Sequence, residues 1–207
     1  MELLESLRYS LHVIFHPFDG FWDLKYEKRG NLKSAIIILL LLILTVIFSR
    51  QNTGFLFNYN DVSRLNVLNE SMRVVLPFFL WCVSSWCLTS LMEGEGTFRD
   101  IVIATSYSLV PLILINFPLS IISNYITLEE GPLLYTFQAI AILWTAFLLY
   151  VGTMVTHQYE PGKTFGTMVL SVIGIMIIIF IGMLFINLIL EISGFVDTIY
   201  KEIIYRI

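Results

Sequence analysis

Long apolar segments alternate with short polar ones along the whole chain. The apolar segments cover residues 34–49, 74–92, 97–122, 132–156 and 164–192. As helices, segments of this length approach or exceed the roughly 30 Å of hydrocarbon in a bilayer. Because the bilayer interior offers no water to backbone N–H and C=O groups, each span must satisfy them within a helix. The pattern therefore predicts an all-α, polytopic membrane bundle with five transmembrane helices.

The best-defined part of this pattern is residues 80–114, LWCVSSWCLTSLMEGEGTFRDIVIATSYSLVPLIL, where an acidic, glycine-containing turn separates two apolar runs. We expect a membrane hairpin here, around which the other spans pack. Thr97 and Asp100 have the spacing of a capping box at the start of the third span. Pro111 and Pro118 interrupt this span, so we expect a kink with freed carbonyl groups.

The two ends of the chain carry amphipathic patterns. In residues 2–16, apolar side chains recur on one arc of a helix, and charged side chains and histidines lie outside it. The apolar arc consists of Leu3, Leu4, Leu7, Leu11, Ile14 and Phe15. We expect residues 1–33 to form an interfacial segment that lies in the headgroup plane or docks into a partner's groove. Gly194 predicts a helix stop, which leaves residues 193–207 as an amphipathic tail beyond the membrane domain of residues 34–192.

Composition supports a membrane protein and excludes one class of partner. The chain has 207 residues, of which 57% are hydrophobic and 14% charged, whereas soluble domains carry roughly a quarter charged residues. The formal net charge is -4, and nucleic-acid binding needs a concentrated basic face, so no nucleic-acid partner is expected. Cys82 and Cys87 lie on different faces of one predicted helix, which disfavours a disulfide between them.

Basic residues set the expected orientation. An odd number of spans puts the termini on opposite sides, and anionic lipid favours Lys and Arg on the cytoplasmic side. With the N-terminus inside, the cytoplasmic set is Arg8, Lys25, Lys28, Arg29, Lys33, Arg99 and Lys163, and the external set is Arg50, Arg64, Arg73, Lys201 and Arg206. We therefore expect a multi-pass protein of the cell membrane with a cytoplasmic N-terminus and an external C-terminus.

This orientation gathers the polar segments 16–33, 93–100 and 157–163 on the cytoplasmic side. The candidate interaction residues there are Lys25, Lys28, Arg29, Glu93, Glu95, Asp100, His157 and Glu160. One interpretation is a metal or hydrolytic site that adds His16, Asp19 and Asp23 to the histidine and acids of that set. The other is a charged cap, whose exposed ion pairs contribute about 0–1 kcal/mol each. No HExxH or paired ExxH spacing is present, so we expect the cap, with no bound metal.

The interiors of the spans carry amides and small residues, with no Asp, Glu, Lys, Arg or His near mid-membrane. Ion-coupled transporters usually place ionisable groups there, so a coupled pump is disfavoured. We expect the amides of Asn116, Gln138 and Asn187 to bond across helices. Glycines recur every eight residues on one flank of the fifth span, where small residues permit close helix approach. The candidate packing or kink positions are Tyr107, Pro111, Asn116, Pro118, Gly166, Gly174 and Gly182.

No enzyme motif accompanies these features. The sequence PGKT at residues 161–164 ends like a phosphate-binding loop, but His157 stands where the loop needs glycine, and a membrane helix replaces the preceding strand. The serines in the spans have no Gly-x-Ser-x-Gly frame and no His or Asp at matching depth. We therefore expect no enzymatic activity and no cofactor.

Four motifs stand out along the chain: HPFDGFWDLKYEKRG, LMEGEGTFRDI, YSLVP and HQYEPGKT. With the five closely spaced spans, they resemble the bacterial branch of the Yip family, membrane proteins named for interaction with Ypt/Rab GTPases. The resemblance implies a five-span bundle with a cytosolic N-terminus. Eukaryotic members act in vesicle traffic and bind prenylated GTPases through a long hydrophilic N-terminal region, whereas only 33 residues precede Ser34 here. Bacterial relatives are often encoded beside ABC-type transporters, which implies an accessory or membrane-stress role.

Together these features predict a non-enzymatic integral membrane protein that acts as an accessory or scaffold for other membrane proteins. Its expected partners are membrane lipids and other membrane proteins, either an ABC-type transporter or a second copy of the chain. One alternative is a passive conduit or lipid-handling protein, which a solvent-lined cavity beside Pro111 and Asn116 would favour. The other alternative is a metal-dependent membrane hydrolase.

Overall fold

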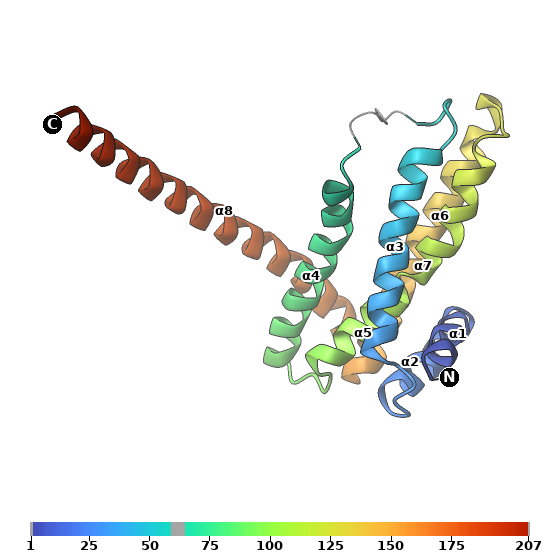
Figure 1. The fold of residues 1–207 in the computed structure, drawn as a ribbon. Helices are drawn as coiled ribbons and strands as arrows, with labels where there is room; N and C mark the ends of the chain where they lie inside the picture. Colours follow the sequence, from blue (N-terminus) through green and yellow to red (C-terminus); the bar gives the residue numbers. More distant parts are fainter. Residues whose placement is uncertain (1, 59–64, 207) are drawn as a thin grey trace.

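The computed structural model describes residues 2–58 and 65–206, which form helices joined by short connections (Figure 1). The α-helices are α1 (Glu2–Phe15), α2 (Pro17–Lys25), α3 (Leu32–Asn52), α4 (Val67–Leu91), α5 (Phe98–Ser108), α6 (Val110–Ile122), α7 (Gly131–His157) and α8 (Pro161–Arg206). A short 3-10 helix, η2 (Leu128–Glu130), precedes α7. The described residues include no strand, so the predicted all-α class is confirmed. Arg64, one of the basic residues expected on the external side, lies outside the described residues.

Five helical segments within the described ranges are long and apolar enough to cross a membrane, as the sequence predicts. They are Leu32–Asn52, Val67–Leu91, Phe98–Ile122, Leu128–His157 and Pro161–Glu202. The first extends beyond the predicted residues 34–49 at both ends. Its start is fixed by Asn31, whose side chain accepts the backbone N–H of Lys33 at 3.2 Å.

Pro111 divides the third span into α5 and α6. The break falls at Leu109, and Pro111 occupies the first turn of α6, where its missing N–H removes no helical hydrogen bond. Pro118 lies inside α6 without ending it. At the other end of α5, the backbone N–H and the hydroxyl of Thr97 both donate to the Asp100 carboxylate. The predicted capping box is therefore confirmed, and so is the kink at Pro111.

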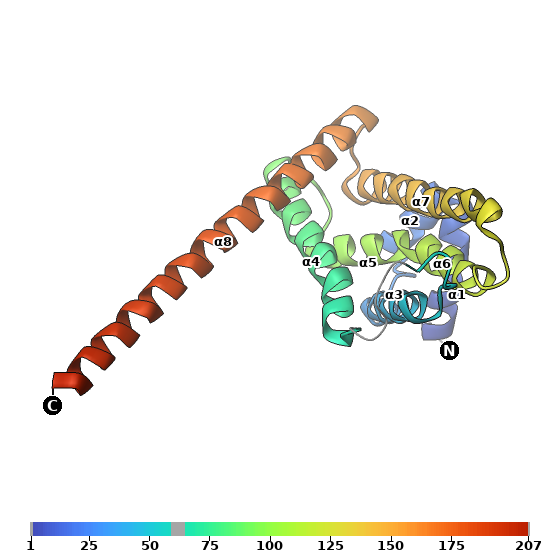
Figure 2. The ribbon, with the colours of Figure 1, turned by 90° about the horizontal axis from the view of Figure 1, so that it is seen from above.

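Helices α3, α5, α6 and α7 form the centre of the molecule, and α1 and α2 pack against one end of it (Figures 1 and 2). The buried core between these helices includes Val13, Phe21, Leu24, Ile38, Ile103, Tyr107, Leu148 and Val151. Because α1 and α2 supply part of this core, residues before the first span are part of the folded domain.

Helix α1 packs through a face that overlaps the predicted apolar arc at Leu7 and Ile14 but is rotated from it. Leu11 and Phe15 stay exposed, whereas Ser6 and Ser10 are buried with Val13 and Ile14. The reason is a polar contact, because Tyr107 of α5 is fully buried and its hydroxyl needs a partner. That hydroxyl lies 2.7 Å from Ser6 Oγ and donates to the Ser6 carbonyl at 3.0 Å. Tyr107, predicted as a packing position, therefore fastens α1 to the bundle.

Helix α8 crosses α4 beside the bundle and then continues away from it (Figure 2). It is continuous from Pro161 to Arg206, so the stop predicted at Gly194 is wrong. One glycine costs only about 1 kcal/mol relative to alanine inside a helix, and apolar residues continue on both sides of it. In the most apolar 18-residue stretch of α8, only 6% of the sequence is buried by the rest of the protein.

Candidate functional site

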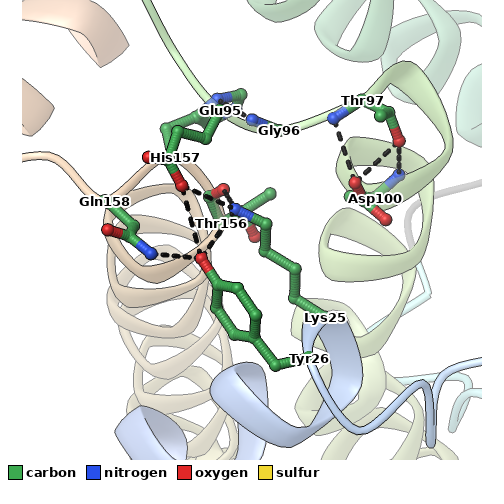
Figure 3. Close-up of polar contacts among 9 residues, drawn as sticks. All are labelled: Lys25, Tyr26, Glu95, Gly96, Thr97, Asp100, Thr156, His157 and Gln158. Atoms are coloured by element: carbon green, nitrogen blue, oxygen red, sulfur yellow. Dashed lines mark hydrogen bonds and ion pairs between the residues drawn. The ribbon is translucent and has the colours of Figure 1, made fainter.

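Three chain reversals meet at the end of the bundle where α1 and α2 pack (Figures 1 and 3). They follow α2, α4 and α7, and we call residues 25–30, 92–100 and 156–160 the cap. Each reversal uses a non-glycine residue with positive φ, namely Lys28 at 54°, Glu93 at 57° and Gln158 at 54°. This left-handed conformation costs about 1–2 kcal/mol per residue, so contacts between the three segments must offset it.

Lys25 connects the three segments of the cap. Its Nζ donates to the Thr156 carbonyl at 2.8 Å and lies 3.6 Å from Glu95 Oε2 (Figure 3). The Thr156 carbonyl belongs to the last turn of α7, where carbonyls lack helical partners and a cation interacts favourably with the helix dipole. The Tyr26 hydroxyl accepts hydrogen bonds from Lys25 Nζ at 3.0 Å and from the Gln158 amide. The contact expected between the basic and acidic segments thus exists at Lys25 and Glu95.

His157 lies at the centre of the cap and is 2% exposed. Its Nδ1 accepts the backbone N–H of Gly96 at 3.2 Å, so in this arrangement Nδ1 carries no proton. A Cβ at Gly96 would lie 2.6 Å from His157 Cε1, and one at Gly94 would lie 2.6 Å from His157 Nδ1. The EGEG turn therefore needs both glycines to pass over the imidazole ring. In the sequence, only the spacing of Gly94 and Gly96 pointed to a tight turn. The sequence alone could not show that His157 lies against this turn.

Tyr159 contacts both His157 and the turn after α4. Its ring stacks on His157 with 5.4 Å between centroids, and its hydroxyl donates to the Met92 carbonyl at 3.1 Å. Burial raises the pKa of the Tyr159 hydroxyl above its ordinary value of 10.0, and the Glu93 carboxylate raises it further. The hydroxyl therefore remains protonated and acts as a donor, which joins the turn after α7 to the turn after α4.

The remaining predicted cap residues do not join this network. Asp100 serves as the helix cap of α5, and Arg29 pairs with Glu27 at 2.7 Å rather than with the acids of the EGEG turn. Among the predicted cap residues, Lys28, Glu93 and Glu160 are exposed and have no described ion pair. Of the eight predicted residues, the structure brings together Lys25, Glu95 and His157.

The described residues contain no group of three His, Cys, Asp or Glu side chains that could hold a metal ion. His16 stacks on His12, with 4.9 Å between ring centroids. His157 contacts a backbone N–H and an aromatic ring. The geometry therefore gives the metal-dependent hydrolase no support.

The three glycines of the fifth span have different surroundings. A Cβ at Gly174 would lie 2.3 Å from Ser84 Oγ of α4, so Gly174 permits the close crossing of α4 and α8. Gly166 and Gly182 have no described atom within 4 Å of such a Cβ. Of the three glycines on the predicted packing flank, only Gly174 contacts another described helix. That Gly166 and Gly182 contact other helices stays a prediction.

The opposite end of the bundle contains a cavity of about 490 Å³ between α3, α4, α6 and α7. Its polar lining consists of Thr45, Ser49, Arg50, Thr53, Asn58, Glu70, Arg73, Asn116, Ser120, Ser123 and Gln138. Its apolar lining includes Val46, Phe57, Leu119, Leu134 and Ile142. Asn116 lies in the wall, as the conduit or lipid-handling alternative requires, but Pro111 is not part of the lining. A volume of this size is typical of small-molecule sites, which span about 300–1,000 Å³.

A buried ionic cluster closes part of this cavity. The side chain of Glu70, at the start of α4, is only 6% exposed, and its Oε1 accepts from Arg50 Nε at 3.0 Å. Arg73 Nη1 lies 3.7 Å from the second oxygen of Glu70. Arg50 is in the last turn of α3, so the Glu70 carboxylate ties the end of α3 to the start of α4. Sequence reasoning missed this cluster because Glu70 appeared only as one polar residue of a mixed loop.

The amides predicted to bond across helices do not do so. The side chains of Asn116, Gln138 and Asn187 have no hydrogen-bond partner among the described residues. Asn116 and Gln138 line the cavity, and Asn187 is exposed on α8. The carbonyl of Asn116 accepts the Ser120 hydroxyl at 2.8 Å, and that hydroxyl lies 2.5 Å from Ser49 Oγ. The prediction is wrong because the kinked third span, α3 and α7 leave a cavity where the amides were expected to meet a neighbour.

Comparison with curated proteins and with solved structures finds no match to this chain. A family model described as the Yip1 domain matches residues 11–194. The match includes the first four apolar helices, the fifth as far as residue 194, the cap and the residues that line the cavity. The chain therefore belongs to the Yip1 domain family of membrane proteins.

Proposed function

We propose that this protein is a non-enzymatic accessory or scaffold protein that binds other membrane proteins through α8. The observation that carries the proposal is the contrast between two parts of this helix. Where α8 crosses α4, Ser84 Oγ donates to the Ser171 carbonyl at 2.7 Å and Gly174 allows the close approach. Beyond the crossing, large apolar side chains such as Phe180 and Phe185 are exposed.

Small residues explain how a second helix would fit against α8. Without a hydrophobic driving force between helices in lipid, association depends on close packing at Gly, Ala and Ser positions. Gly182 follows Gly174 by eight residues on nearly the same flank, and nothing lies within 4 Å of its ideal Cβ position. A helix of an ABC-type transporter, or α8 of a second copy, would pack there as α4 packs at Gly174.

The orientation belongs to the same proposal. Four basic residues lie between the end of α2 and the first turn of the first span, where anionic lipid favours the cytoplasmic side: Lys25, Lys28, Arg29 and Lys33. The proposed orientation has the cap and the N-terminus in the cytoplasm, and the cavity and the C-terminus on the external side of the cell membrane. We also propose the bacterial branch of the family for this chain, because motifs such as LMEGEGTFRDI and HQYEPGKT carry that resemblance.

Replacing Gly182 tests this function. We expect Gly182→Leu to lower the amount of copurifying membrane partner, or of a second copy, by about fivefold or more, because overpacking costs about 1–3 kcal/mol and about 1 kcal/mol already weakens association about fivefold. The measurement is affinity purification from native membranes in mild detergent, followed by quantitative mass spectrometry.

Ile181→Leu is the matched control, because it changes a neighbouring exposed apolar residue and keeps the glycine. It should leave recovery unchanged. A wild-type chain that brings down no stoichiometric membrane partner or second copy would contradict the proposal, as would full recovery with Gly182→Leu.

The cavity supports a second candidate function, in lipid handling. It combines charged, amide and apolar side chains, and it lies between helices that cross the bilayer. Such a site suits a molecule with a polar head and an apolar chain.

A further inference from the structure

Two amides in the polar lining of the cavity, those of Asn116 and Gln138, have no hydrogen-bond partner among the described residues. Both residues lie within spans, where an unpaired amide in hydrocarbon carries a large desolvation cost. Water or the polar part of a ligand in the cavity would give these amides hydrogen-bond partners.

The charges at the mouth of the cavity favour an anion. Among the described lining residues, Arg50 and Arg73 face a single carboxylate, that of Glu70. Arg50 uses its Nε for Glu70, but Arg73 has one long contact of 3.7 Å and a side chain that is 63% exposed. Its guanidinium keeps donors in the planar arrangement that suits phosphate oxygens.

The apolar surroundings favour a lipid over a soluble anion. Val46 of α3 and Leu134 and Ile142 of α7 line the cavity itself. An apolar groove of about 580 Å³ adjoins it on α3 and α6, lined by residues such as Leu44 and Phe117, and Thr45 borders both spaces. A molecule with its head at the arginines thus has an apolar path for a chain along the membrane-facing side of the bundle.

We propose that this cavity binds an anionic membrane phospholipid, with its phosphate group at Arg73 and Arg50 and an acyl chain in the groove beside Thr45. The amides of Asn116 and Gln138 bond to the glycerol or ester region of the same lipid. The inference rests on the lipid-handling function and is independent of the partner proposed for α8. Lipid binding and partner recovery are measured separately, so either can fail alone.

Lipid counting on the purified full-length protein tests this site. The protein is delipidated in detergent and offered equal amounts of phosphatidylglycerol and phosphatidylcholine, and bound lipids are counted by native mass spectrometry. We expect one phosphatidylglycerol per chain, retained about tenfold better than phosphatidylcholine. Arg73→Gln should weaken that preference about tenfold, which is a typical effect of losing one charge-assisted contact. Arg73→Gln leaves the bond between Arg50 and Glu70 in place.

Arg99→Gln is the matched control, because it removes the same charge from an exposed arginine at the cap end. It should leave lipid binding unchanged, whereas Gln138→Leu should reduce it without removing any charge. Equal retention of the two lipids would overturn the proposal, and so would equal losses with Arg73→Gln and Arg99→Gln. If millimolar inorganic phosphate displaced the lipid from the wild-type chain, the ligand would be a soluble anion and the lipid assignment would be wrong.

Discussion

Gly96→Ala lowers the Tm of the purified protein by several degrees, because the cap has no room for a methyl group. The added Cβ would lie 2.6 Å from His157 Cε1 and 2.8 Å from Thr156 Cγ2. His157 cannot move away easily, since it is buried, stacked on Tyr159 and bonded to the Gly96 N–H. Overpacking of this kind costs about 1–3 kcal/mol, or about 2–12 °C for a chain of this size. Thermal unfolding in detergent, followed by circular dichroism, measures the change.

Gly162→Ala provides the matched control for this substitution. Gly162 lies in the first turn of α8 with nothing within 4 Å of its ideal Cβ position. Alanine is a better helix former than glycine by up to about 1 kcal/mol, so the Tm should stay constant or rise slightly. If Gly96→Ala matched Gly162→Ala, the close packing of the EGEG turn on His157 would be disproved.

Glu70→Gln should destabilise the protein by about 2–3 kcal/mol. Removing one partner of a buried ion pair costs about 3–5 kcal/mol because it leaves the other charge uncompensated. We expect a loss at or below the bottom of that range, because the arginines left behind are partly solvated: the side chain of Arg50 is 24% exposed and that of Arg73 is 63% exposed. Without the carboxylate, the positive charges of Arg50 and Arg73 would face each other with no anion between them. Chemical denaturation in mixed micelles compares the free energies of unfolding.

Glu95→Gln is the control for this change, because its ion pair with Lys25 is at the surface and its side chain is 58% exposed. Exposed pairs contribute about 0–1 kcal/mol, so we expect a much smaller loss of stability. Adding Arg50→Gln to Glu70→Gln should restore part of the lost stability, since the buried charge disappears with its partner. Equal effects of Glu70→Gln and Glu95→Gln would show that the cluster at the cavity does not tie α3 to α4.

The features that the sequence predicted are those that depend on local chemistry. The apolar segments had to become membrane spans, because hydrocarbon leaves the backbone no alternative to helices. Pro111 had to break the third span, and Thr97 with Asp100 had to cap α5, because both effects act within one turn. The contact between Lys25 and Glu95 follows from chain topology, although Glu93 was an equal candidate before the turn geometry was known.

The features that the sequence did not predict depend on packing between distant segments. Residues 2–16 showed an apolar arc, but Tyr107 rotates α1 so that Ser6 faces inward. The prediction that Gly194 ends the helix was wrong, because α8 continues past this glycine to Arg206. The cavity required the positions of four helices at once, so Asn116 and Gln138 could not be assigned to it from their spacing.

Site-specific labelling tests the central claim, a five-span bundle with its cap in the cytoplasm. In a chain carrying Cys82→Ala and Cys87→Ala, single cysteines are introduced by Glu95→Cys in the cap and by Tyr125→Cys in the exposed turn after α6. A membrane-impermeant maleimide is added to intact cells and, separately, to permeabilised cells. The account predicts that Tyr125→Cys reacts in intact cells and that Glu95→Cys reacts only after permeabilisation. Labelling of both positions from the same side, or of Glu95→Cys alone in intact cells, would contradict it.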